Sequence, residues 1–258
     1  MNHASDSCRI SREFISDTGT TTLIFERFRP DEQVDVLLAG PAFHTSSSGV
    51  FAQGLVSFSP DGSRPAARQI MIGTSEPDGT VLILFGKWDL LNRSAQPFGK
   101  FSVPAPSPAQ EKVISAVTLV VGDEARTFQI DTLGAPMAAM RECTDALVRD
   151  WGLDPRQQAA LLHKVEPLGS PGTWATDFDM PPAMRRQRMN VQARFRLMID
   201  VKGKPTACYI QRPLSVAGLG ALTCRLLLER ARFKPAQDAT GRPVPSYYVN
   251  AINWFSGP

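Results

Sequence analysis

Asp17-Thr18-Gly19 has a spacing known from catalysis, because it matches the signature of aspartic proteases. That chemistry needs two carboxylates that share one proton, so it requires a second copy of the signature or a dimer. No second Asp-Thr-Gly or Asp-Ser-Gly occurs in the sequence. Asp and Gly are also typical of hairpin turns, and a turn is the interpretation that we favour here.

The other reactive side chains do not form a recognisable catalytic set. His44 precedes a Ser-rich run at 45–48, but no Gly-x-Ser-x-Gly motif accompanies it. The sequence has neither a metal-binding spacing of His and Cys nor a glycine motif for phosphates or dinucleotides. We therefore predict a protein that is not an enzyme and has no cofactor. An enzyme with its site in residues 1–165 is the alternative.

The four cysteines are even in number but few for 258 residues. They are Cys8, Cys143, Cys208 and Cys224. No Cys-x-x-Cys pair occurs, so zinc-ribbon and thioredoxin-type sites have no support. From the count alone, free buried thiols and disulfides are equally compatible with the sequence.

Charge divides the chain unevenly. Residues 181–258 carry 13 Lys and Arg against three Asp and Glu, whereas residues 1–180 carry 15 against 22. Such an imbalance is typical of two domains with different surfaces.

A basic cluster lies in the positively charged part of the chain and consists of Arg185, Arg186, Arg194 and Arg196. On a strand, Arg194 and Arg196 would face solvent together. An anionic envelope polymer is a candidate partner for this cluster, and a merely solvated face is the other interpretation. We do not expect nucleic acid as a partner.

Residues 1–135 predict strands and turns. Short β-prone runs alternate with turn sequences such as Pro60-Asp61-Gly62 and Gly122-Asp123-Glu124. No apolar run approaches the roughly 20 residues of a membrane helix, so we expect no membrane span. The first residues lack the basic and apolar regions of a signal peptide, so we expect any signal or anchor segment to be absent from this sequence.

Helices are expected after this β-rich part. Apolar residues at helical spacing predict one helix over 136–151, and Asp154 followed by Pro155 predicts the start of another. Residues 166–182 contain four prolines and two glycines, which is typical of a linker.

The last part of the chain has the clearest pattern. Residues 191–201 alternate between apolar and polar side chains, which predicts a strand with one buried face. A Lys202-Gly203-Lys204 turn leads to a second strand, a helix capped by Ser215 and running to about Arg232, and a last strand over 244–255.

Residues 174–258 resemble the C-terminal domain of TonB energy transducers. The resemblance rests on the Asp200-Val201-Lys202-Gly203-Lys204 turn and on the order of the motif residues Phe233, Pro235, Ala236 and Gly241 before an aromatic-rich strand. In this interpretation Pro235 ends the helix, Phe233 fills the space between helix and sheet, and Gly241 permits the turn into the last strand. The resemblance implies a ββαβ fold with a three-stranded antiparallel sheet.

The resemblance also implies a function without catalysis. In the family a partner's peptide pairs with the sheet as an added strand, and the matching residues here are Val244, Ser246, Tyr248, Asn250 and Ile252. A cell-envelope binding protein with a link to TonB-dependent transport is therefore expected, with an envelope protein or peptide as partner.

With this resemblance added, disulfides are favoured over free thiols. Cys208 lies on the expected core face of the second strand and Cys224 on the helix above it, so these two would pair and leave Cys8 to Cys143. Disulfides favour an oxidising compartment, which predicts a protein of the periplasm or cell envelope.

The predicted fold class is α+β. A β-rich domain that ends in one or two helices is expected over 1–165, a linker over 166–182, and the TonB-like domain over 183–258.

Overall fold

The computed structural model describes most of the chain, and the described residues are 2–4, 6–44, 51–60, 65–74, 78–92, 106–187 and 189–255. Contacts divide the chain into two compact units, which we call unit 1 (Met1–Asp145) and unit 2 (Ala146–Pro258). The division falls within a helix and not in the expected linker over 166–182.

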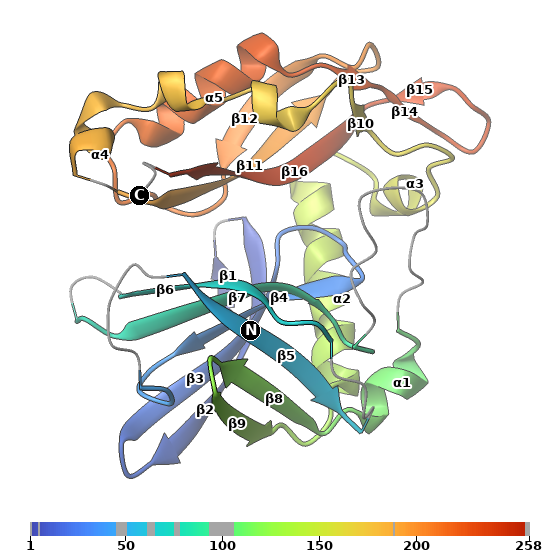
Figure 1. The fold of residues 1–258 in the computed structure, drawn as a ribbon. Helices are drawn as coiled ribbons and strands as arrows, with labels where there is room; N and C mark the ends of the chain where they lie inside the picture. The colour runs from blue at the N-terminus through green and yellow to red at the C-terminus, as the bar shows by residue number, and fades with distance from the viewer. Residues whose placement is uncertain are drawn as a thin grey trace. The chain divides into compact units, whose positions relative to one another are not determined.

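Unit 1 is built around one antiparallel sheet (Figure 1). Its strands are β1 (Asn2–Ala4), β2 (Ser7–Ser16), β3 (Gly19–Arg27), β4 (Gln33–Ala39), β5 (Phe51–Ser59), β6 (Arg68–Thr74), β7 (Val81–Asp89), β8 (Ala116–Val121) and β9 (Glu124–Gln129). Their order in the sheet is β1-β2-β3-β4-β7-β6-β5-β8-β9. The β-rich N-terminal part expected from the sequence is therefore confirmed.

Helices α1 (Pro108–Val113) and α2 (Gly134–Asp150) follow β7 and β9 in the chain. Ser107 caps α1 reciprocally with Gln110, since each side chain accepts a hydrogen bond from the backbone N–H of the other residue. Among the described residues, no helix combines the length and the apolar character needed to cross a bilayer.

Two turn sequences of unit 1 form hairpins as expected, whereas residues 61 and 62 of the Pro60-Asp61-Gly62 turn lie outside the described residues. Asp17 and Thr18 connect β2 to β3, where Ser16 pairs with Gly19, so the protease-like signature is a turn. Gly122 and Asp123 connect β8 to β9, and Gly122 has a φ of 57° that glycine adopts without steric cost.

The sheet of unit 1 curls until strands from its two ends meet. Strand β2 is second in the order and β9 is last, yet the rings of Phe14 and Phe128 lie 4.9 Å apart between centroids. The side chains of Arg12 and Asp131 form an ion pair of 2.6 Å beside them. The natural twist of antiparallel strands accumulates across nine strands and brings these ends together.

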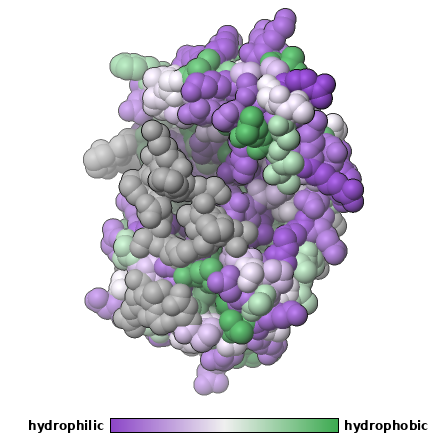
Figure 2. Space-filling view, turned by 90° about the vertical axis from the view of Figure 1, so that its right-hand side faces the viewer, coloured by the Kyte–Doolittle hydropathy of each residue, from purple (hydrophilic) through white to green (hydrophobic). Residues whose placement is uncertain are grey.

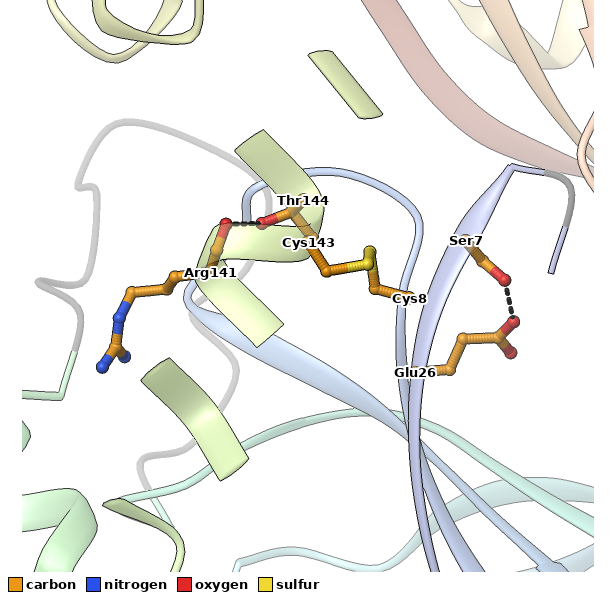
Figure 3. The surroundings of a disulfide bond; sticks show 6 residues. All are labelled: Ser7, Cys8, Glu26, Arg141, Cys143 and Thr144. Carbon is orange, nitrogen blue, oxygen red and sulfur yellow. Dashed lines mark hydrogen bonds between the residues drawn. A yellow bond between two sulfur atoms is a disulfide. The ribbon is translucent and has the colours of Figure 1, made fainter. Parts of the chain in front are cut away.

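The Cys8–Cys143 disulfide ties β2 to α2 (Figure 3). Both cysteines are buried, and the side chain of Ser7 beside them donates a 2.6 Å hydrogen bond to Glu26. The carboxylate of Glu26 is fully buried and also forms an ion pair with the guanidinium of Arg9, at 2.8 Å. A buried charge with two partners of this kind avoids most of the cost of leaving water.

Asp31 is a second well-paired carboxylate in unit 1. Burial alone would raise its pKa, but the charges of Lys87 and Arg29 and the hydrogen bonds from Lys87 and the Gln33 backbone N–H outweigh burial. The pKa of Asp31 therefore falls to about 2. The folded state holds Asp31 as a carboxylate more strongly than the unfolded state does.

Unit 2 has its own secondary structure after the end of α2. Its elements are α3 (Pro155–Ala159), β10 (Glu166–Pro167), η1 (Pro171–Thr173), η2 (Asp177–Asp179), α4 (Pro182–Arg186), β11 (Val191–Ile199), β12 (Pro205–Ile210), α5 (Leu219–Arg230), β13 (Phe233–Lys234), β14 (Ala236–Gln237), β15 (Pro243–Val244) and β16 (Ser246–Trp254). The largest sheet has the order β12-β11-β16 and is antiparallel (Figure 1). The start of α3 is as predicted, because Asp154 accepts a hydrogen bond from the Arg156 backbone N–H.

The segment over 166–182 is part of the core of unit 2, which differs from the expected linker. Pro171 and Gly172 lie in the short helix η1, η2 follows it, and the buried side chains of Trp174 and Met180 belong to the two hydrophobic clusters beside α5. The guanidinium of Arg230 donates to both carboxylate oxygens of Asp179 at 2.6 and 2.7 Å. Composition indicated a linker here, but two large apolar side chains anchor the segment in the core of unit 2.

Two expected boundaries near α5 also differ. The helix begins at Leu219 after Gly218, whose φ is 75°, so Ser215 does not cap it. It ends at Arg230, and Pro235 lies between β13 and β14, so Pro235 does not end the helix. The chain is already extended at Ala231 before Pro235 is reached.

The Cys208–Cys224 disulfide joins β12 to α5. Together with the Cys8–Cys143 disulfide, it gives the pairing predicted for the four cysteines. Both pairings are thus confirmed. Cys208 and Ile210 share the face of β12 that packs against the core, as expected.

Asp31→Asn should lower the free energy of unfolding by about 2 kcal/mol at pH 7, because a pKa depressed from 3.8 to about 2 corresponds to that stability. The contribution of a depressed carboxylate is complete above its unfolded pKa and disappears as the pH falls toward 2. Urea denaturation at pH 7 and near pH 2 should therefore show a deficit that vanishes in acid. The exposed turn variant Asp123→Asn is the matched control, and a pH-independent deficit would contradict the account.

Removing the Cys208–Cys224 bridge in a double alanine variant should cost about 3 kcal/mol, since it closes a loop of 16 residues. The Cys8–Cys143 bridge spans 135 residues and should contribute roughly 5 kcal/mol on the same loop-entropy basis.

Alkylation and mass spectrometry without reductant should find none of the four thiols modified. Labelling of any cysteine in the unreduced, denatured chain would refute the pairing.

Candidate partner-binding edge

Strand β11 is the central strand of the sheet in unit 2. Val191, Phe195 and Ile199 point toward the core beside α5, as the alternating sequence predicted. Ser246, Tyr248, Asn250, Ile252 and Trp254 of β16 are the Cα partners of the odd-numbered residues of β11. The two sets of side chains therefore lie on the same face of the sheet.

The direction of the backbone groups of β11 follows from two hydrogen bonds. The Gln211 N–H donates to the Arg194 carbonyl at 2.9 Å, and the Thr206 hydroxyl donates to the Met198 carbonyl at 3.2 Å. Even-numbered residues of β11 thus point their backbone groups toward β12. Because these groups alternate along a strand, the odd-numbered residues bond to β16.

The outer side of β16 follows from this alternation. Tyr248, Asn250 and Ile252 face odd-numbered residues of β11 and direct their backbone groups toward it. The N–H of Ala251 donates instead to the side-chain oxygen of Asn250, at 2.9 Å. Backbone groups of the alternate residues therefore point away from the sheet, and these residues are Tyr247, Val249, Ala251 and Asn253. We call this row the outer edge of β16.

The sequence named a partner-binding strand of Val244, Ser246, Tyr248, Asn250 and Ile252, and the structure divides this set. Val244 belongs to β15, where it pairs with Ala236. Ser246 is buried and donates a 2.7 Å hydrogen bond to the side chain of Gln158. The other residues bond toward β11, so the groups at the outer edge belong to their neighbours in sequence.

Helix α3 covers the start of β16. The side-chain amide of Gln158 donates a 3.0 Å hydrogen bond to the Pro245 carbonyl while its oxygen accepts from Ser246. Trp151 lies edge-on to Tyr247, with ring centroids 4.9 Å apart. Contacts from Trp151 and Gln158 thus hold the chain from Pro245 to Tyr247, and the part of the outer edge beyond Tyr247 is the candidate site.

The expected basic patch is not a single solvent-facing cluster. Arg196 is only 6% exposed, because its guanidinium stacks between the rings of Trp151 and Tyr209 at 4.4 and 4.2 Å. Arg194 is partly buried on the same face, whereas Arg185 and Arg186 are exposed on α4. The expectation that Arg196 faces solvent is therefore wrong, since two rings from other elements cover it.

A tight turn attaches the sheet to the segment after α5. The Asp200 carboxylate accepts hydrogen bonds from the Lys202 and Lys204 N–H groups at 2.8 and 2.9 Å. The bond from Lys204 is the largest cause that lowers the pKa of Asp200 below its ordinary value. Within this turn the Gly203 carbonyl accepts a 3.0 Å bond from the Phe233 N–H. A backbone–backbone hydrogen bond thus joins the turn to β13.

The motif residues of the resemblance occupy structural positions. Phe233 is buried and its ring lies near those of Trp174 and Tyr248, with centroids 5.3 and 5.0 Å away. Ala236 is fully buried in β14. Gly241 has a φ of 81° and closes the turn between β14 and β15, as expected. These residues shape unit 2 without lying on the outer edge.

Hydrophilic residues dominate the face drawn in Figure 2. Among the coloured residues of this view, apolar ones form small separate groups instead of one continuous patch. Binding through backbone hydrogen bonds at a strand edge does not require a large apolar patch.

The residues singled out for chemistry do not come together. His44 lies 3.3 Å from Glu124 on β9, and residues 45–48 of its Ser-rich run lie outside the described residues. In the part of the chain that the structure describes, no three metal-ligating side chains gather.

The comparisons with known proteins found no matching family model, no matching curated protein and no matching solved structure.

Gly203→Ala should destabilise unit 2 by at least about 3 kcal/mol. Its φ of 78° disfavours a side chain, and a Cβ would meet the Phe233 carbonyl oxygen at 1.9 Å. Gly241→Ala is the matched control, since it has a φ of 81° but no atom within 4 Å of an added Cβ, and it should cost about 1 kcal/mol. Urea midpoints that shift equally in the two variants would disprove the backbone contact.

Proposed function

We propose that this chain is a non-catalytic binding protein of the cell envelope, in which unit 2 binds an extended peptide as an added strand. The observation that carries the proposal is the outer edge of β16. There the backbone N–H of Ala251 donates a hydrogen bond to the side-chain oxygen of Asn250 in the same strand. An edge strand offers such groups to another chain, and added strands are a common mode of peptide recognition.

The resemblance to TonB C-terminal domains supports this proposal. Two strands, a helix and a last strand occur along the chain as β11, β12, α5 and β16, with the short strands β13, β14 and β15 between α5 and β16. Apart from these short strands, this is the order that the resemblance implies. In that family the added strand comes from the N-terminal segment of a receptor. A link of this protein with TonB-dependent transport is part of the proposal.

The compartment and a second class of partner are proposed from the disulfides and the charge. Two disulfides favour an oxidising compartment, for which the periplasm is our choice. Unit 2 carries 16 Lys and Arg against eight Asp and Glu, which favours contact with an anionic envelope polymer. Of the expected basic patch, the exposed Arg185 and Arg186 are the residues best placed for it.

An enzyme with its site in unit 1 is the alternative. It requires a nucleophile or a base beside a cavity. A cavity does lie in unit 1, but among its described lining residues the carboxylate of Asp131 is paired with Arg12 at 2.6 Å, and no histidine stands beside the hydroxyl groups of Ser11 and Thr132. A binding role is therefore the better-supported function.

Ala251→Pro should strongly weaken peptide binding with little loss of stability. Proline removes the outward N–H and blocks pairing at the outer edge, and the hydrogen bonds to β11 remain because they come from the alternate residues. We would titrate the whole chain with synthetic peptides that match N-terminal segments of TonB-dependent receptors. We expect at least a tenfold loss of affinity, the equivalent of one or two hydrogen bonds.

Ala251→Val is the matched control, because it keeps the N–H and should bind like the unaltered chain. Failure of every receptor segment to bind at about 1 mM would contradict the proposed partner. Binding that survives Ala251→Pro would contradict the proposed edge.

A further inference from the structure

Unit 1 contains a cavity at the place where its sheet curls upon itself. The cavity has a volume of about 250 Å³. Strands β2 and β3 line one side of it, and the connection from β9 to α2 lines the other. The position of the cavity depends on the approach of the two ends of the sheet, so no local sequence motif marks it.

The floor of the cavity is apolar. It is formed by the buried side chains of Leu23, Phe25, Ile130 and Leu133. An engineered apolar cavity of about 150 Å³ is known to bind benzene. A cavity of 250 Å³ therefore accommodates a benzene-sized group together with a small polar head.

The mouth of the cavity carries one cation and one anion. Arg12 and Asp131 form their 2.6 Å ion pair across it, with side chains that are 45% and 80% exposed. The backbone of Asp131 is held at a φ of 60°, which few residues other than glycine, Asn and Asp adopt. The Thr132 hydroxyl next to it donates to the Lys112 carbonyl at 2.8 Å, which helps to fix the connection.

We propose that this cavity binds a free α-amino acid with an aromatic or long aliphatic side chain. The carboxylate of the amino acid pairs with Arg12, its ammonium pairs with Asp131, and its side chain occupies the apolar floor. A surface ion pair contributes little to stability. Breaking the Arg12–Asp131 pair so that each side chain can pair with one end of the ligand therefore costs little free energy. Burial of the side chain supplies the favourable free energy.

The charges at the mouth select this class over simpler amphiphiles. A plain carboxylate would meet Arg12 but be repelled by Asp131, and a plain amine would meet the opposite conflict. A zwitterion satisfies both groups. The proposed amino-acid site lies in unit 1 alone and is independent of the proposed role of unit 2.

The test is isothermal titration of the whole chain with L-phenylalanine. We expect saturable binding with a Kd between about 10 μM and 1 mM, as suits a ligand of this size. Glycine lacks the apolar side chain, 3-phenylpropanoate lacks the ammonium group and phenethylamine lacks the carboxylate. Each of the three should bind at least tenfold more weakly than L-phenylalanine. Equal binding of 3-phenylpropanoate or phenethylamine would overturn the proposal, as would the absence of binding by phenylalanine, tryptophan and leucine at about 10 mM.

Two variants that each remove one charge locate the site. Arg12→Gln and Asp131→Asn should each weaken phenylalanine binding at least tenfold, and Asn tolerates the backbone conformation of residue 131. Arg126→Gln is the matched control, because Arg126 is a paired arginine of β9 that does not line the cavity. Circular dichroism confirms that each variant is folded before titration. Unchanged affinity in both site variants would overturn the assignment.

Discussion

The pairing of β11 on both of its sides is the constraint on which unit 2 depends. Its even-numbered residues bond toward β12 and its odd-numbered residues toward β16, while its odd-numbered side chains form the core beside α5. A strand has only two sides and two faces, so this arrangement fixes which backbone groups of β16 remain at the edge. A shift of one residue in the register would exchange the core residues for the arginine row of β11.

The connections around β11 hold that register. The Cys208–Cys224 bridge attaches the helix to β12, and the Gly203 turn attaches the start of β12 to β13. Gln158 attaches α3 to the beginning of β16. Unit 1 is held together differently. Its nine strands curl so that β2 contacts β9, and the Cys8–Cys143 disulfide attaches α2 to β2. Each unit therefore positions its candidate site through contacts between residues far apart in sequence.

Local features of both units could be predicted from the sequence. Hairpin turns such as Gly122-Asp123, the Asp154 cap and the alternation of β11 need only neighbouring residues. The disulfides were predictable because the resemblance placed Cys208 and Cys224 on facing elements. The proline-rich segment over 166–182 was not, since the burial of Trp174 depends on a core that the segment itself does not contain.

The candidate sites were harder to predict than the elements. Arg196 alternates like a solvent-facing residue, but Trp151 and Tyr209 from other elements cover it. Alternation divides β16 into two sets of residues and does not say which set bonds to β11, so the sequence named the inner set. The cavity depends on the curl of nine strands, and neither Arg12 nor Asp131 carries a local signal.

Hydrogen exchange at single amides of β16, followed by NMR, tests the central claim most directly. The account predicts alternation, with slow exchange at Tyr248, Asn250 and Ile252 and fast exchange at Val249, Ala251 and Asn253. A bound peptide strand should then slow the second set alone. Uniform slow exchange along β16 without any peptide would contradict the claim, because the outer edge would already be covered.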